Sequence, residues 1–260
     1  MDETALDRAH ARMQAAPDDD AARLAFFDRL AGAELFLLLA QEAEGDNVSP
    51  ETFPIDAASY VAAFDTEQRL ADFACRIAPY VALSGRTLAA TLSDQGLGLA
   101  LNPEVGPSAM VLSPETVTWF AAMLAGRPSE VEARPVSVTA PTGLPAPLLA
   151  ALDAKLAVAG GLARHAWLVC VSYADGRTGE LLAFVDAMPG AEPALARAVG
   201  EALSFSGVEA GELDVAFFRD ADPVVTRIAR VGLRFDLPEP RLLQEPAAPG
   251  KDPDRPPRLK

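Results

Sequence analysis

Cysteine and histidine are scarce in this sequence, whose 260 residues include two of each. Two cysteines, Cys75 and Cys170, are too few for the disulfide framework that stabilises small secreted domains. A zinc site needs clustered cysteine or histidine ligands, and here the cysteines, His10 and His165 are spread along the chain. The composition therefore argues against a disulfide scaffold and against a zinc protein.

Basic residues are also few, with 22 lysines and arginines against 37 acidic residues and a net charge of -15. A surface of this sign repels phosphate backbones and anionic lipids. We therefore expect neither nucleic acid nor a membrane surface as a partner. The imbalance is concentrated in residues 1–125, which carry 19 acidic and seven basic side chains, whereas residues 237–260 carry four and five.

The sequence has no long apolar run suited to a membrane. The longest window without charge, 135–152, contains four prolines, which interrupt a membrane-spanning helix. The first ten residues, MDETALDRAH, carry acids where a signal peptide has basic residues and an apolar run. We expect a cytoplasmic protein. The low lysine content, three against 19 arginines, is typical of bacteria with GC-rich genomes.

Alternating apolar residues and turn residues predict a first α/β domain over residues 1–125. Residues 34–41, ELFLLLAQ, are apolar on both faces, so we expect a central strand that is covered on both sides. Two strands, 52–56 and 59–64, form a hairpin around Ala57–Ala58. The remaining expected elements are helices at 2–16, 18–31, 65–77 and from 84 to near 96, strands at 79–83, 97–101 and 108–112, and a helix from 113.

One amphipathic helix is expected to begin at Asp65. Asp65 and Gln68 have the spacing of a capping box. Apolar residues then follow at helical spacing: Leu70, Phe73, Ala74 and Ile77. This pattern predicts one helix that buries all four side chains.

The stretch from 96 to 123 contains the residues that we retain as candidates for an interaction surface. Pro103 favours an extended Asn102, whose side chain can bond its own backbone in a turn. Gly106 and Pro107 form a second turn. The candidates are therefore Asn102, Pro103, Gly106 and Pro107, although each also has a sufficient structural role. The small residues of strand 97–101 predict that something packs closely against it.

Residues 33–124 resemble the N-terminal domain of the SseB family of bacterial proteins. The matching segments are AELFLLLAQEAEGD, SYVAAFDTEQRLADFA, VALSGRTLAATL, and GLGLALNP followed by LSPETV, in the same order and spacing. Glu104 stands where the family has a glycine after the Asn-Pro pair. The family is named for increased serine sensitivity and has no assigned catalytic residues. The resemblance therefore implies a fold and no site.

A second α/β domain is expected over residues 126–237, after a linker at 125–131. Its expected strands are 136–139, 164–173, 180–186, 213–219 and 231–237, and its helices are 145–159, 192–204 and 222–229. Residues 135–237 resemble the C-terminal domain of the same family more loosely, through VSVTAPTGLPAPLLAAL and HAWLVCVSY. The proline-rich segment 238–260 is expected to be disordered. The sequence thus predicts two small mixed α/β domains, each a sheet covered by helices.

Motifs for catalysis or cofactor binding are incomplete in this sequence. His165 and Cys170 are five residues apart, so on one strand they point to opposite faces, and Cys170 is expected in the core. Leu101 stands where a dinucleotide fingerprint beginning at Gly96 needs its last glycine. We therefore predict no catalytic residue, no cofactor and no metal.

Three functions are compatible with this sequence. The first is a non-enzymatic adaptor or regulator that acts through an unidentified protein partner. The second is a small-metabolite module, such as an amino-acid sensor, with its cleft near 102–107 or between the domains. The third is an enzyme whose site the motif search does not recognise.

Overall fold

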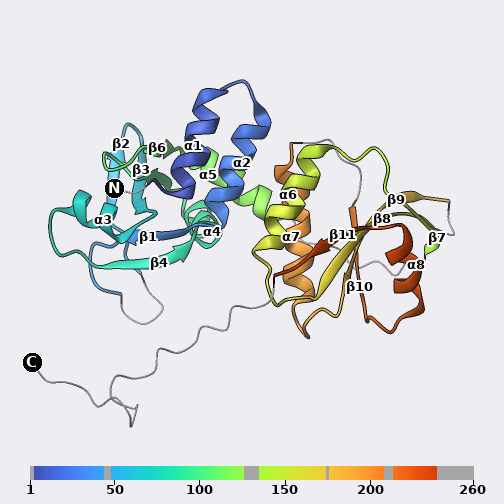
Figure 1. Ribbon diagram of the computed structural model, residues 1–260. Coiled ribbons are helices and arrows are strands. Elements are labelled where there is room, and N and C mark those ends of the chain that lie inside the picture. The colour runs from blue at the N-terminus through green and yellow to red at the C-terminus, as the bar shows by residue number, and fades with distance from the viewer. Residues whose placement is uncertain (1–2, 44–47, 126–134, 174–175, 208–212, 239–260) are drawn as a thin grey trace, which may run out of the picture.

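The computed structural model of this chain describes residues 3–43, 48–125, 135–173, 176–207 and 213–238. It contains two mixed β-sheets, each packed against helices, which confirms the expected α/β fold class (Figure 1). The predicted linker and the predicted disordered tail lie outside the described residues, apart from Ala125 and Pro238.

The first sheet has the strand order β4-β1-β3-β5-β6, and β2 also pairs with β3. Its strands are β1 (Glu34–Leu38), β2 (Thr52–Ile55), β3 (Ala58–Phe64), β4 (Tyr80–Ser84), β5 (Gly98–Leu101) and β6 (Met110–Leu112). β3 and β5 run parallel, whereas the other pairs are antiparallel. The β2–β3 turn lies at Asp56–Ala57 rather than at Ala57–Ala58, and Asp56 has a φ of 51°.

The two faces of this sheet are covered unequally. The main core lies on one face, against α1 (Ala5–Ala15), α2 (Asp20–Ala31), α4 (Gly85–Gln95) and α5 (Pro114–Leu124). The other face carries only α3 (Glu67–Ala74) among the helices of the described chain, and Figure 1 shows α3 on the side away from α1 and α2. Leu35 and Leu37 enter the main core and Leu38 enters the smaller one, but Phe36 is only half-buried, so β1 is fully covered on one side and partly covered on the other.

The helix ends follow local chemistry where the sequence specifies it. Ser84 and Ser113 cap α4 and α5, and the left-handed Gly96 ends α4, as predicted. The prediction for α3 was wrong at both ends. Thr66, not Asp65, caps the helix, and Cys75 ends it in a left-handed conformation with a φ of 50°. As a result, Ile77 lies beyond the helix and is fully exposed.

The second sheet has the order β10-β9-β8-β11, with β7 also paired to β8. Its strands are β7 (Pro135–Thr139), β8 (His165–Tyr173), β9 (Thr178–Val185), β10 (Leu213–Phe218) and β11 (Leu233–Asp236). Helices α6 (Ala146–Ala157) and α7 (Glu192–Phe205) pack on one face, and α8 (Pro223–Val231) packs on the other. These elements agree with the predicted ones to within a few residues.

Helix α7 joins the two sheets. Phe205, at its end, is buried in the main core of the first sheet. Glu201 accepts two hydrogen bonds from Arg86 of α4, and the Lys155 ammonium of α6 lies 3.1 Å from Glu201 and 2.5 Å from Asp28 of α2. A partly buried cluster of two cations and two carboxylates, with Glu201 at its most buried point, thus lies between the sheets.

Candidate functional site

The loop that holds the four predicted residues lies at the carboxyl ends of the parallel strands β3 and β5. Open α/β sheets commonly bind ligands at this position. Asn102 follows β5 directly and is fully buried. Its side-chain carbonyl accepts a hydrogen bond of 3.1 Å from the backbone N–H of Asp65, and its amide donates one of 2.8 Å to Ser108.

This arrangement corrects the prediction of an extended Asn102. The residue has a φ of 44°, in the left-handed region that asparagine tolerates better than most residues. Its two hydrogen bonds reach other segments of the chain, and they outweigh the preference that Pro103 imposes on its neighbour. A fully buried Asn102 cannot itself contact a partner.

The other three candidates are more accessible. Pro103 and Gly106 are half-buried and Pro107 is exposed. A Cβ at Gly106 would lie 2.9 Å from the Arg69 guanidinium carbon, so the missing side chain lets this cation lie against the loop. The structure gathers the four residues in one loop, and a binding role for that loop stays a prediction.

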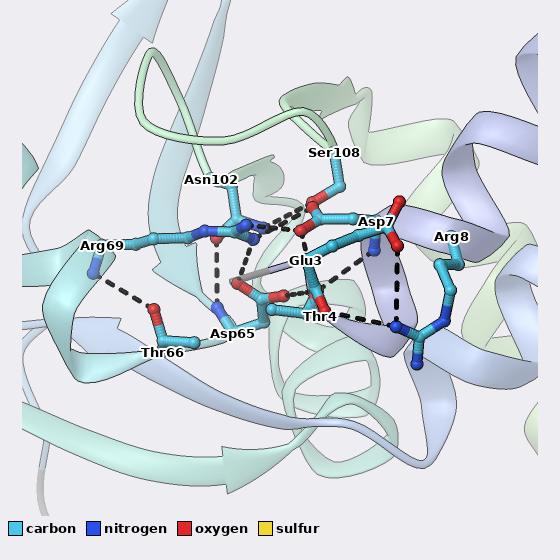
Figure 2. A network of polar contacts seen from close by, with 9 residues as sticks. All are labelled: Glu3, Thr4, Asp7, Arg8, Asp65, Thr66, Arg69, Asn102 and Ser108. Atoms are coloured by element: carbon cyan, nitrogen blue, oxygen red, sulfur yellow. Dashed lines mark hydrogen bonds and ion pairs between the residues drawn. The ribbon is translucent and has the colours of Figure 1, made fainter. Parts of the chain in front are cut away.

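A buried ionic network lies directly beneath the loop (Figure 2). Arg69, on α3, binds the Asp7 carboxylate of α1 through contacts of 2.5 and 3.1 Å and the Asp65 carboxylate at 2.7 Å. Ser108 donates a 2.6 Å hydrogen bond to Asp7, and Thr4 donates one of 2.6 Å to Asp65. Sequence reasoning missed this network, because Asp7 and Arg69 are 62 residues apart.

The network holds fixed charges. Burial alone would raise the pKa of Asp7, but hydrogen bonds from Arg69, Ser108 and the backbone of Thr4 hold that pKa far below its usual value. The hydrogen bond to Asp7 likewise raises the pKa of Arg69. Neither group can exchange a proton near neutral pH, as a general acid or base must. The network therefore fastens α1, α3 and the loop together.

Beside the network, the face of the first sheet that carries α3 is incompletely covered. The small core under α3 consists of four buried side chains: Leu38, Ala62, Phe64 and Leu70. Around it lie half-buried or exposed apolar side chains that we call the open face: Phe36, Phe53, Phe73, Tyr80 and Ala82. The fully exposed Ile77 follows α3 and is next in sequence to Ala78, which packs against the same small core. Val105 of the loop packs against the same small core, so the loop borders the open face.

Aromatic rings dominate the open face. The rings of Phe36 and Tyr80 lie 5.6 Å apart, and those of Phe53 and Phe73 lie 6.1 Å apart. Tyr80 is 43% exposed and donates a 2.8 Å hydrogen bond to Glu67. Tyr80 also begins β4, the strand at one end of the sheet order, whose residues YVALS carry no charge. An uncharged edge strand beside exposed aromatic rings is a surface suited to protein contacts.

His165 and Cys170 both lie on β8 of the second sheet and not on this face. His165 is buried with its ring against Trp167, and burial and the nearby Arg234 lower its pKa. Cys170 is half-buried, which corrects the prediction of a core residue, because it lies toward the β7 end of β8. In the part of the chain that the structure describes, no cluster of residues could hold a metal ion, and no helix is long and apolar enough to cross a membrane.

The second sheet has a pocket of about 430 Å³ at the ends of β8, β9 and β11. Two arginines and two aspartates line it: Arg164, Arg234, Asp186 and Asp236. Arg234 lies 2.5 Å from Asp236, and Arg164 lies 3.8 Å from Asp186. These residues all belong to the second sheet and its adjoining loops, and none comes from the 102–107 loop where the sequence suggested a cleft.

Comparisons with known proteins give one match. The family model of the SseB protein N-terminal domain matches residues 6–119. This range begins in α1, ends in α5 and includes the whole first sheet. Comparisons with curated proteins and with solved structures each found no match. The looser resemblance of residues 135–237 to the C-terminal domain lies outside the matched range.

Proposed function

We propose that the protein, whose residues 6–119 match the family model of the SseB protein N-terminal domain, is a non-enzymatic adaptor or regulator that binds another protein through its open face. The observation that supports the proposal is the aromatic surface around Phe36 and Tyr80 beside the uncharged strand β4. A partner segment that pairs with this edge would gain main-chain hydrogen bonds and cover the rings at the same time.

The buried network supports a role without catalysis. Asn102, Ser108 and Asp7 form a hydrogen-bonded chain at the carboxyl ends of β3 and β5, and each is fully buried or nearly so. A substrate could not reach them without unfolding of the loop. The position that many α/β proteins use for a ligand is thus filled by the chain's own charges.

The proposal is tested by affinity capture of the full chain from its native cells. Ala82→Glu places charge on the open face and Ile77→Glu places charge beside it, both at exposed positions, so the fold should be retained. We expect both variants to lose a partner that the unaltered chain recovers. Val136→Glu is the matched control, because Val136 is exposed on the second sheet and should retain the partner. Equal recovery by all four chains would refute a role for the open face.

We propose as a second possibility that the pocket of the second sheet binds a zwitterionic metabolite such as an amino acid. Its arginines suit a carboxylate and its aspartates suit an ammonium group. A thermal-shift measurement with serine and related amino acids at millimolar concentration tests this possibility. We expect a rise in Tm that Arg234→Ala abolishes. No shift with any ligand would eliminate it.

A further inference from the structure

We propose that residues 239–260 of the same chain dock on the open face and compete there with the external partner. This inference rests on the proposed function, because it names the open face as the shared site. The segment reads EPRLLQEPAAPGKDPDRPPRLK, with six prolines, five basic residues and four acidic ones. The competition would make binding of the external partner depend on release of the tail.

The chemistry of the segment matches the aromatic surface. Proline-rich segments bind to aromatic grooves because their backbone loses little conformational entropy on binding, and proline rings pack well against aromatic rings. The open face offers Phe36 and Tyr80 in contact at one side and Phe53 and Phe73 in contact at the other. Leu242 and Leu243 add two apolar side chains to the segment.

Charge also favours this pairing. Residues 1–125 have a net charge of -12, whereas the last ten residues carry four basic and two acidic side chains. Glu67 accepts a hydrogen bond from the neutral Tyr80 hydroxyl, and Asp72 accepts one from the neutral amide of Gln68. Neither hydrogen bond brings a cation to these two carboxylates of α3. A second copy of the first sheet would instead bring together two acidic surfaces.

The segment is long enough to reach the face. It begins after Pro238, whose carbonyl accepts a 3.0 Å hydrogen bond from Gly161, so its start is fixed to the second sheet. Its 22 residues span roughly 70 Å in a polyproline conformation, against a radius of gyration of roughly 18 Å expected for a folded chain of this size. A tethered segment has an effective concentration of about a millimolar, so weak contacts suffice.

The natural thiol of Cys75 provides the test, because it is exposed directly after α3. We would attach a nitroxide to Cys75 in the full chain carrying Cys170→Ser and record the amide NMR signals of residues 239–260. We expect the label to broaden these signals. The control carries the label at Ala90→Cys, with Cys75→Ser and Cys170→Ser, because Ala90 is exposed on α4 on the opposite side of the sheet.

Two sets of variants test the contacts. Ile77→Glu with Ala82→Glu should restore the tail signals, as should Arg255→Glu, Arg258→Glu and Lys260→Glu made together. Equal broadening from the Ala90 label, or none from the Cys75 label, would overturn the inference. Broadening that occurs only between a labelled chain and a separate isotope-enriched chain would also overturn it, by showing a second copy. If the tail fails this test while the face variants still lose the external partner, the proposed function stands.

Discussion

At the residue scale, Arg69 connects α3 to Asp7 of α1, which is 62 residues away in the sequence. Its guanidinium is almost fully buried and binds carboxylates from α1 and from the end of β3. A buried ion pair adds little when compared with a well-packed apolar replacement, but loss of one partner leaves an uncompensated buried charge. The contribution of Arg69 should therefore be seen when it alone is removed.

We predict that Arg69→Met lowers the free energy of unfolding by about 3–5 kcal/mol, because Asp7 and Asp65 would stay buried without their cation. Urea denaturation measures this change. Arg76→Met is the matched control, since the Arg76–Glu51 pair is solvent-accessible and should contribute about 1 kcal/mol or less. Equal effects of the two substitutions would contradict the role given to the network.

Asp7 predicts a dependence of stability on pH. Its pKa in the folded chain is below the ordinary value of 3.8, so its contribution is fully present above that value and is lost as the pH falls below it. The difference in unfolding free energy between the natural chain and Asp7→Asn should shrink from about pH 5 to about pH 2. Burial raises the pKa of Asp28, so this group changes the free energy of unfolding with pH in the opposite direction. The effect is the same in both chains and cancels in their difference. A constant difference over this range would argue against an ionised Asp7.

At the element scale, the parallel pair β3–β5 depends on a glycine. A Cβ at Gly98 would lie 2.3 Å from the ring of Tyr60, which crosses β5 at this point, and 2.9 Å from the carbonyl oxygen of Leu112. This contact confirms the prediction that something packs closely against strand 97–101.

We predict that Gly98→Ala lowers the free energy of unfolding by about 1–3 kcal/mol, because the buried Tyr60 ring must move. Gly200→Ala provides the control. No atom lies within 4 Å of the corresponding Cβ at Gly200, inside α7, so this substitution should stabilise the chain by about 0.5–1 kcal/mol. The Tm and the urea midpoint should therefore fall for Gly98→Ala and rise for Gly200→Ala.

The elements also show how far the sequence determines the fold. Strands, caps and helix ends that depend on neighbouring residues, such as Ser84 and Gly96, are predictable because the deciding contacts lie within a few positions. The start of α3 was not predictable from neighbouring residues. Arg69 binds Asp65 in a network with Asp7, and Thr66 therefore caps the helix instead of Asp65. At the other end, the left-handed Cys75 stops α3 and so leaves Ile77 exposed beside the open face.

At the scale of the whole molecule, the charged cluster between the sheets couples them. Burial raises the pKa of Glu201, but hydrogen bonds from Arg86 and the charge of Lys155 outweigh it, so the net pKa is lowered and the carboxylate stays ionised. Glu201 thereby compensates cations from α4 and α6 at once. The two sheets should lose this coupling when its central carboxylate is neutralised.

We predict that Glu201→Ala costs roughly 2–5 kcal/mol of stability, because Arg86 and Lys155 lose a buried partner. The rate of amide hydrogen exchange should rise in α2 and α7, the helices through which the two sheets are packed together. Asp153→Asn, at an exposed position on α6, is the control and should change neither quantity. Unchanged exchange in the Glu201 variant would show that apolar contacts such as Phe205 suffice to hold the sheets together.

The central claim is that the open face binds a protein, and photo-crosslinking in living cells tests it most directly. A photoreactive amino acid would replace Ile77 in one chain and Val136 in another. Both positions are exposed, but Ile77 lies after α3 beside the first sheet and Val136 lies in the second sheet. The account predicts an adduct with a distinct partner from position 77, absent from position 136 and reduced by Ala82→Glu. Identical adducts from both positions, or no adduct from position 77, would contradict it.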